Sequence, residues 1–413
     1  MFEYNSDFWK LANEVECSCA EQFKTIDITF NKNQQKIISA FIKHKAGTQH
    51  LTGTTGYGYG DIGRELIDNI YAEIFETEAA LVRHHFVSGT HAIAVCLFAI
   101  LRPGDKLVCA TGTPYDSLER ILGKIKCGEG SLSDFNIKYT EVKWGKDTFN
   151  KQMLAQKCQN AKSVYIQRSR GYSARTSLDF KQTEEIIRLV KKANEAAIII
   201  VDNCYCEFVQ PIEYSSANLT VGSLIKNPGG GIAQTGGYIV GEKNLIDLCA
   251  NRLTAPGLGG EVGCSLDQNR EILMGLFMAP QAVANALKTA VFCAAFFKKL
   301  GFDVNPKPNE ARADIVQSVS LKTKERLINF CAGVQAASPI DSFVKPEKWN
   351  MPGYKDEIIM ACGGFTNGAT IESSADAPIR EPYTAFFQGG LNFPSGKLCV
   401  LEAAWRVIQT GIS

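Results

Sequence analysis

The residues of this sequence best suited to chemistry are a carboxylate and a lysine, each placed at the end of an apolar stretch. Asp202 follows Ile198-Ile199-Ile200-Val201, a run that is apolar at every position and therefore predicts a buried parallel strand. Lys226 ends the segment Ser223-Leu224-Ile225-Lys226 and precedes Asn227-Pro228 and three glycines, which we expect to leave space beside it. Apolar neighbours favour the neutral form of a lysine, which is the form that condenses with an aldehyde. We therefore expect a ligand site at this sheet edge, with a buried acid that needs a cationic or hydrogen-bonding partner.

A second candidate is an anion site at the start of a helix. Ser88-Gly89-Thr90-His91 precedes the apolar stretch Ala92–Leu101 and follows a predicted strand. Backbone N–H groups and the positive end of a helix dipole converge at such a start, and Gly89 would let a phosphate approach the chain closely. The Ser88 or Thr90 hydroxyl could donate to the phosphate, or could equally be an ordinary N-cap.

A third pattern, Gly58-Tyr59-Gly60-Asp61-Ile62-Gly63, matches the G-x-G-x-x-G spacing of dinucleotide-binding proteins. That site requires a strand immediately before the first glycine, and the segment Thr52–Tyr57 predicts none. Asp61 would also place a negative charge where the pyrophosphate should lie. The tract is therefore not expected to bind a nicotinamide cofactor, and its openness indicates an arm.

Composition limits the class of protein that holds these residues. The chain has 413 residues, 45% of them apolar, and 44 basic against 43 acidic side chains. This length and apolar share predict two or three domains with sizeable cores, and the balanced charge gives no footprint for nucleic acid. The partner is expected to be a small molecule.

Location is also constrained by composition. The longest purely apolar run, Ala92–Leu101, is too short to span a membrane, and the acidic N-terminus is unlike a secretory signal. The cysteines are scattered, with two Cys-x-Cys pairs and no Cys-x-x-Cys, as expected for reduced thiols. We expect a cytoplasmic protein that does not contact membranes and holds no metal.

Alternating apolar strands and helical stretches must position the candidate residues, and they predict an α/β fold with a mostly parallel sheet. Helices are expected at Gln34–Lys43, Thr90–Leu101, Thr183–Ala193 and from about Ser265 to Lys299. After a change of pattern at Gly301, a smaller α+β unit is expected, with helices near Lys324–Ala337 and Gly396–Ile408. The predicted strands are Ala80–Val87, Lys106–Ala110, Ile137–Val142, Ser163–Gln167, Ala197–Asp202, Gly222–Ile225 and Gly237–Val240, then Ile315–Leu321, Glu357–Ala361 and Thr384–Gln388.

A helix-start phosphate cradle, a strand-end Asp and then Ser-x-x-Lys, in that order, resemble the pyridoxal 5′-phosphate enzymes with the aspartate-aminotransferase-like fold, fold type I. Among these the chain is similar to the cystathionine γ-synthase and methionine γ-lyase branch, and most to the methionine γ-lyase or aluminium-resistance group. Together with the change of pattern at Gly301 and the open glycine tract, this predicts an N-terminal helix and arm over 1–60, a large domain over 61–300 that the resemblance implies binds the cofactor, and a small domain over 301–413. The stretches that carry the resemblance are Tyr57–Arg64, Ser88–Ala92, Ile166–Tyr172, Ser223–Gly231 and Ser374–Arg380.

The resemblance implies a role for each cofactor residue. Lys226 would form the internal aldimine and then move the Cα proton, and Asp202 would pair with the pyridine nitrogen. Ser88, Gly89, Thr90 and Ser223 would hold the phosphate. Tyr115 would stack on the cofactor ring, with a core tyrosine at a helix start as the alternative, and Gln167 would contact the ring oxygen or the substrate.

The remaining implied roles concern the substrate and a second subunit. Arg380 would bind the substrate carboxylate; the alternatives are a surface arginine, or that Arg64, Arg168, Arg170 or Arg175 does so. Tyr57 and Tyr59 would reach the phosphate site of a neighbouring subunit in a homodimer or tetramer with shared active sites, or would pack locally. Gln234 and Cys204-Tyr205-Cys206 depart from the better-known sulfur-amino-acid lyases and leave the substrate open.

The resemblance implies a lyase that cleaves the carbon–sulfur bond of cystathionine, methionine or cysteine by β- or γ-elimination. Two alternatives stay open. One is another pyridoxal-phosphate reaction of amino acids, such as transamination or aldol cleavage. The other is a stress-response protein that binds the cofactor with little turnover.

Overall fold

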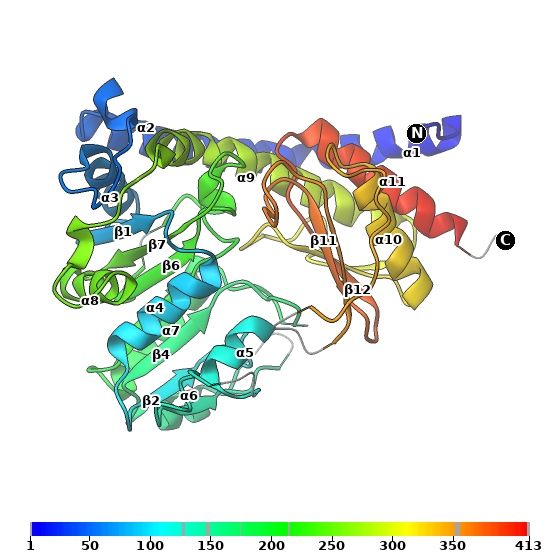
Figure 1. Cartoon of the computed structure of the whole chain (residues 1–413). Helices are drawn as coiled ribbons and strands as arrows, with labels where there is room; N and C mark the ends of the chain where they lie inside the picture. The colour runs from blue at the N-terminus through cyan, green and yellow to red at the C-terminus, as the bar shows by residue number, and fades with distance from the viewer. Residues whose placement is uncertain are drawn as a thin grey trace.

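The computed structural model describes residues 2–125, 129–145, 149–173, 175–213, 215–351 and 356–410. Two sheets organise these residues, a larger one in the first two thirds of the chain and a smaller one in the last third (Figure 1). A single long helix, α9 (Gln268–Lys299), runs past both.

The larger sheet has the strand order β1-β7-β6-β5-β4-β2-β3. Strands β2 to β6 pair in parallel, whereas β7 runs antiparallel to both β6 and β1. The central strands are buried on both faces, which explains why β5 is apolar at each position before Asp202. The bounds are β1 Ala79–Arg83, β2 Lys106–Cys109, β3 Lys138–Glu141, β4 Ser163–Gln167, β5 Ile198–Asp202, β6 Leu219–Ser223 and β7 Gly237–Gly241.

Helices cover both faces of this sheet. On one face, α4 (Gly89–Ile100), α5 (Asp116–Leu122) and α8 (Lys243–Leu253) pack on side chains such as Ile200 and Ile239. On the other face, α6 (Lys151–Cys158) and α7 (Phe180–Ala193) pack on Val164 and Ile199. The same face is continued by α3 (Ile62–Ile74), α2 (Ala20–Lys43) and the first half of α9.

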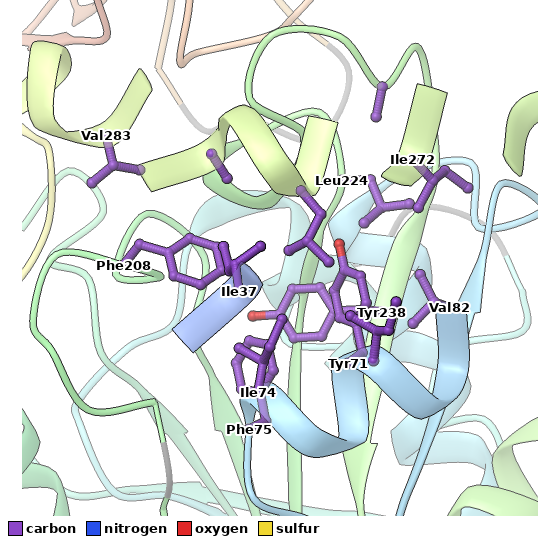
Figure 2. Close-up of a cluster of buried hydrophobic side chains, with 14 of the residues drawn as sticks. Ile37, Tyr71, Ile74, Phe75, Val82, Phe208, Leu224, Tyr238, Ile272 and Val283 are labelled. Carbon is purple, nitrogen blue, oxygen red and sulfur yellow. The ribbon is translucent and has the colours of Figure 1, made fainter. Parts of the chain in front are cut away.

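One part of this second layer is shown in Figure 2, where side chains from α3 and α9 meet over β7. The rings of Tyr71 and Phe75 lie 5.7 and 5.2 Å from the ring of Tyr238, and Leu224 and Ile272 close the cluster from above. Tyr71, Phe75 and Tyr238 are fully buried, and aromatic side chains of this size bury large apolar areas. The turn that follows β6 is therefore fixed against α9, and this turn carries Lys226.

The smaller sheet is antiparallel, with the order β10-β11-β12-β9-β8. Its core lies against α1 (Ser6–Ser18), α10 (Lys324–Ala336), α11 (Phe393–Gln409) and the second half of α9, which contributes Phe292, Phe296 and Phe297. The first and last helices of the chain, α1 and α11, both lie beside this sheet (Figure 1). The strand bounds are β8 Asp303–Asn305, β9 Gln317–Ser320, β10 Ile358–Cys362, β11 Ser374–Pro378 and β12 Thr384–Gln388.

Short 3-10 turns complete the chain trace. They are η1 (Thr48–Leu51), η2 (Asn227–Gly229) and η3 (Gly259–Glu261). Among the described residues, α9 is the one helix that by length and composition could cross a membrane, but most of it is buried within the protein, as expected of a core helix.

The α/β class and the parallel sheet are confirmed, and several element bounds are corrected. The strand predicted over Gly222–Ile225 lies three residues earlier as β6, and the one predicted over Ala80–Val87 ends at Arg83. Helices α1, α3, α6 and α8 and strands β8 and β11 were not predicted, and α5 entered only as the helix start in the alternative for Tyr115. Asp61 is the N-cap of α3 and accepts a hydrogen bond from the Arg64 amide, and the glycines before it lie in turns and irregular segments.

Candidate active site

A cavity of about 370 Å³ opens at the carboxyl ends of β4, β5 and β6, and the smaller sheet forms its opposite wall. Ligands of parallel α/β sheets bind at this edge, because loops and helix starts converge there. The side chains that line it from the first sheet and its loops are Ser88, Gly89, Thr90, Tyr115, Ser117, Gln167, Ser169, Gly171, Tyr172, Asp202, Cys204, Tyr205, Ser223, Ile225 and Lys226. Those from the last third of the chain are Met351, Met360, Cys362, Gly368, Thr370, Ser374 and Asp376.

Lys226 lies in the turn after β6, with its amino group inside the cavity. The amino group donates a hydrogen bond of 2.6 Å to the Tyr205 hydroxyl and one of 3.4 Å to Thr370. It also lies 4.0 Å from the centre of the Tyr205 ring. The amino group therefore contacts two hydroxyl groups that the apolar neighbours in the sequence did not predict, while Ile225, Met351 and Met360 also line the cavity.

The sequence suggested that the glycines after Lys226 leave open space. The structure shows that they do not. A side chain at Gly229 would collide with the Leu224 carbonyl oxygen, and a Cβ at Gly230 would lie 2.5 Å from the Gly275 carbonyl oxygen. Gly230 also has a φ of 56°, which disfavours other residues. These glycines let the turn pack against α9 and so hold Lys226 in place.

Asp202 is buried at the end of β5, and its carboxylate faces the cavity. It accepts hydrogen bonds from the Tyr165 hydroxyl at 2.7 Å and from the Cys204 amide at 3.1 Å. Burial raises the pKa of Asp202, although these two hydrogen bonds and the charge of Lys226 act against that rise. No ion pair within 4 Å involves Asp202 among the described residues, so the carboxylate can accept a cationic partner from the cavity.

The predicted anion site lies at the start of α4. Ser88 is the N-cap, because its hydroxyl accepts a hydrogen bond of 3.1 Å from the His91 amide. Thr90 accepts a hydrogen bond of 3.0 Å from the Tyr115 hydroxyl. Ser223, directly opposite, has a buried hydroxyl without a hydrogen-bond partner in the described part of the chain.

Gly89 stands between these groups. A Cβ on it would lie 3.1 Å from the Cβ of Ser223 and 3.4 Å from the Cys204 sulfur, so a side chain there would narrow the space at the helix start. A buried donor that lacks an acceptor is costly, and an anion at this helix start would supply one. The N-cap alternative holds for Ser88, and Ser223 and Gly89 line the cavity beside the same helix start.

Tyr115 and Gln167 complete the wall beside the cradle. Tyr115 precedes α5, and burial holds the pKa of its hydroxyl well above the usual range, so the ring enters the site as a neutral phenol. The Gln167 side chain accepts a hydrogen bond of 3.1 Å from the Tyr115 amide and donates one of 3.0 Å to the Ser169 carbonyl. Gln167 therefore fixes the position of Tyr115 as well as lining the cavity.

Arg380 lies outside this cavity, in an adjoining one of about 390 Å³ that shares Tyr115, Gln167 and Tyr172 with it. Its guanidinium pairs with Asp356 at 2.6 Å and donates a long hydrogen bond of 3.4 Å to the Tyr172 carbonyl. The side chain is 43% exposed, so a carboxylate in the adjoining cavity can reach it.

The rival arginines make internal hydrogen bonds instead. Arg64 donates to the Gly58 and Gly263 carbonyls, and Arg175 donates to the Gln167 and Ser169 carbonyls. Arg168 donates to Asn203, and Arg170 donates to Ser318 at 3.0 Å. Arg170 also lines the adjoining cavity, so it remains the one rival near Arg380.

Tyr57 and Tyr59 do not reach the cavity of their own chain. They lie on the surface with their ring centres 5.9 Å apart, and they are 77% and 64% exposed. Local packing, the alternative for these two tyrosines, therefore covers only a small part of their surface. Their role toward a second subunit stays a prediction.

The sequence did not single out Asp376, Tyr205, Thr370 or Tyr172, which all line the cavity. Tyr205 was part of a noted departure, Cys204-Tyr205-Cys206, and its φ of 73° places it in a tight turn after β5. Asp376 lies on β11, within the Ser374–Arg380 stretch that carried the resemblance, but it was given no role there. Thr370 lies in the loop just before this strand.

The residues present fit pyridoxal phosphate, the cofactor that the resemblance implies. Ser223 has an unused hydroxyl for a phosphate oxygen, Gly89 leaves the room, and Asp202 is a buried carboxylate for a protonated ring nitrogen. Lys226 supplies an amine with which the cofactor's aldehyde can condense.

Comparison with known proteins gives a family and close relatives. The family model described as methionine gamma-lyase matches residues 8–408. The chain is 47% identical over 406 residues to the uncharacterized protein YnbB of Bacillus subtilis, covering 97% of this chain and 96% of that one. A solved structure from Clostridium novyi NT, described as a carbon–sulfur lyase involved in aluminum resistance, is 42% identical with a TM-score of 0.93, covering 98% of this chain and 96% of that one.

More distant structures share the fold. The pyridoxal-5′-phosphate-dependent protein YhfS of Escherichia coli has a TM-score of 0.62 at 17% identity, covering 93% of this chain and 97% of that one. Cystathionine gamma synthase of Xanthomonas oryzae pv. oryzae has the same TM-score at 16% identity, covering 92% and 99%. The chain therefore has the fold type I architecture, with a mostly parallel sheet and a smaller antiparallel sheet toward the C-terminus.

Proposed function

Since the chain belongs to the methionine gamma-lyase family, we propose that it is a pyridoxal-phosphate-dependent lyase that cleaves a carbon–sulfur bond in a sulfur-containing amino acid. The observation that carries the proposal is the convergence of Lys226, Asp202 and the unpartnered Ser223 hydroxyl on one cavity. The relative from Clostridium novyi NT, which is described as a carbon–sulfur lyase, supports the reaction type.

When bound, pyridoxal phosphate supplies an aldehyde that condenses with amines and a ring that accepts electrons from the carbon beside the amine. Ser223, Gly89, Thr90 and the α4 amides would hold the phosphate at the helix start. Asp202 would keep a proton on the ring nitrogen, because its buried negative charge favours a cation beside it. Tyr115 would pack on the ring face.

The amino group of Lys226 would bind the cofactor's aldehyde and, once released by a substrate amine, would take the Cα proton. Tyr205 and Thr370 orient this amino group through hydrogen bonds, so it can accept a proton and deliver it within the same cavity. In an elimination the carbon–sulfur bond would break, its electron pair would leave with the sulfur, and Lys226 would be placed to give the proton that makes this group a thiol. β- and γ-elimination differ in where a second proton is removed, and a single lysine could move the protons in either reaction.

Arg380 would draw the substrate carboxylate toward the adjoining cavity. Met351, Met360 and Cys362 line the main cavity with apolar, polarizable groups that suit the thioether or thiol of a sulfur amino acid. The exposed Tyr57 and Tyr59 would complete the phosphate site of a second copy, which makes the proposed enzyme a homodimer or tetramer with shared active sites. The proposed location is the cytoplasm.

The test is to incubate the cofactor-loaded protein with cystathionine, methionine and cysteine and to measure both thiol and keto-acid release. The proposal predicts both products from at least one substrate, and none from Lys226→Ala. Keto acid without thiol would favour transamination instead. An absence of product and of spectral change with every substrate would favour a cofactor-binding protein with little turnover.

A further inference from the structure

Asp376 is a carboxylate in the main cavity to which neither the sequence nor the proposed mechanism gives a role. It lies on β11, in the smaller sheet, and faces the cavity from the wall opposite Asp202. The buried Gln388 side chain donates a hydrogen bond of 3.0 Å to one of its oxygens, and a second hydrogen bond comes from the Tyr172 side chain. Both donors are neutral, so they orient the carboxylate without balancing its charge.

The charges around Asp376 are unequal. Lys226 is the only cationic side chain among the described residues that line the cavity, whereas Asp202 and Asp376 are both acidic. Lys226 is close enough to stabilise the ionised form of Asp376, but no ion pair within 4 Å joins the two in the described structure. If Lys226 is bound to the cofactor's aldehyde and Asp202 is paired with the ring nitrogen, Asp376 is left without a cation.

Tyr172 connects this carboxylate to Arg380. Its side chain bonds Asp376, its carbonyl oxygen accepts the bond from Arg380, and it lines both cavities. A negative group in the main cavity and a positive group in the adjoining one are thus held on either side of one residue. A zwitterion whose carboxylate lies at Arg380 would direct its ammonium group toward Asp376 and Lys226.

We propose that Asp376 binds the α-ammonium group of the incoming amino acid and accepts its proton before the nitrogen reacts. This inference rests on the proposed function, since it takes the ligand to be an amino acid. An ammonium has no electron pair with which to attack, so a proton must leave first. In this step one N–H bond breaks, its electron pair stays on nitrogen, an O–H bond forms on Asp376, and nothing is oxidised or reduced.

The test compares two ligands that differ only in the amine. The first is α-methyl-L-methionine, which cannot be turned over because it has no Cα hydrogen, and the second is the same acid with hydrogen in place of the amino group. Their affinities for the cofactor-loaded protein are measured by calorimetry. The wild type should bind the amine ligand more tightly, and Asp376→Asn should weaken that ligand about tenfold while changing the other by no more than about twofold.

Two further variants separate charge from structure. Asp376→Glu keeps the negative charge and should retain more of the preference than Asp376→Asn. Glu357→Gln removes an exposed carboxylate that pairs with Lys348 beside β10, and it should leave both affinities unchanged. A wild type that does not distinguish the two ligands, or an Asp376→Asn protein that weakens both equally, would overturn the inference. If the preference depends on Asp376 but no thiol is released from any sulfur amino acid, the proposed lyase reaction fails and this inference stands.

Discussion

The amino group of Lys226 donates a hydrogen bond of 2.6 Å to the hydroxyl of Tyr205, and the two residues follow consecutive strands, β6 and β5. Burial, and next the negative charge of Asp376, hold the pKa of Tyr205 well above its usual range. The hydroxyl therefore stays neutral and accepts the hydrogen bond from Lys226. This pair sets where the lysine amine points.

Tyr205→Phe should lower kcat about tenfold and leave the cofactor bound, because the amine loses the group that aims it at the Cα proton. Steady-state kinetics and the visible absorption spectrum measure the two effects. Tyr139→Phe is the matched control, since that hydroxyl bonds Glu141 outside the cavity. Equal kinetics for Tyr205→Phe and wild type would rule out this role.

Asp202→Ala should retain the cofactor but lower kcat by a factor on the order of 100, because the ring nitrogen loses the buried charge that keeps it protonated. The affected step is proton removal, so the exchange of the Cα hydrogen with solvent deuterium, followed by NMR, should slow in parallel. Unchanged turnover and exchange would remove Asp202 from the mechanism.

Ser223→Ala should weaken cofactor affinity about tenfold, because the phosphate would lose a charge-assisted hydrogen bond from a buried donor. Equilibrium dialysis against pyridoxal phosphate measures the affinity. Ser163→Ala is the control, since its hydroxyl is also buried but bonds the Ile198 carbonyl at the start of β4, outside the cavity. Equal losses in both variants would argue against a phosphate contact at Ser223.

Glu207→Gln should reduce the loss of folding stability that the wild type shows as the pH rises. Burial raises the pKa of Glu207 to about 8, and the Tyr238 hydroxyl donates a hydrogen bond of 2.8 Å to it. Between about pH 4.5 and pH 8 the unfolded chain loses this proton and the folded chain keeps it, so stability falls with pH across that window.

Glutamine cannot titrate and keeps an oxygen for Tyr238. Urea unfolding should therefore show that the variant loses less stability than wild type between about pH 5 and about pH 8, by on the order of 1 kcal/mol or more. The exposed Glu357→Gln gives the reference for a carboxylate that is not buried. A wild type and a Glu207→Gln protein with parallel pH profiles would contradict the buried, protonated state.

Local sequence patterns were sufficient to place Asp202, Lys226 and Ser88–Thr90 at one edge of the parallel sheet, whereas Tyr115 and Gln167 came from the resemblance and Tyr205 and Tyr172 were missed. Asp202 ends an all-apolar run, and Lys226 and Ser88–Thr90 follow buried strands, so all of them fall at the same sheet edge once the strands are parallel. Asp376 could not be found in this way. Its strand, Ser374-Ala375-Asp376-Ala377-Pro378, consists of small residues and a proline, which give no strand signal.

The sequence also could not predict which residues contact Lys226. Tyr205 adopts a left-handed backbone conformation, which depends on the packing of its turn rather than on residue type. The glycines after Lys226 indicated a turn, but only α9 packed against them explains why no side chain is tolerated there. In the same way, the helical periodicity near the N-terminus indicated only Gln34–Lys43. The polar first half of α2 and all of α1 depend on packing against α9 and against the hydrophobic core beside the smaller sheet.

The central claim is that Lys226 binds pyridoxal phosphate covalently. The most direct measurement is the visible absorption spectrum of the purified protein before and after borohydride reduction, followed by peptide mapping of the modified lysine. The account predicts a yellow protein whose colour is lost on reduction, with the cofactor fixed to the peptide that contains Lys226 and no fixation in Lys226→Ala. A protein that stays colourless with added pyridoxal phosphate, or a cofactor fixed at another lysine, would contradict it.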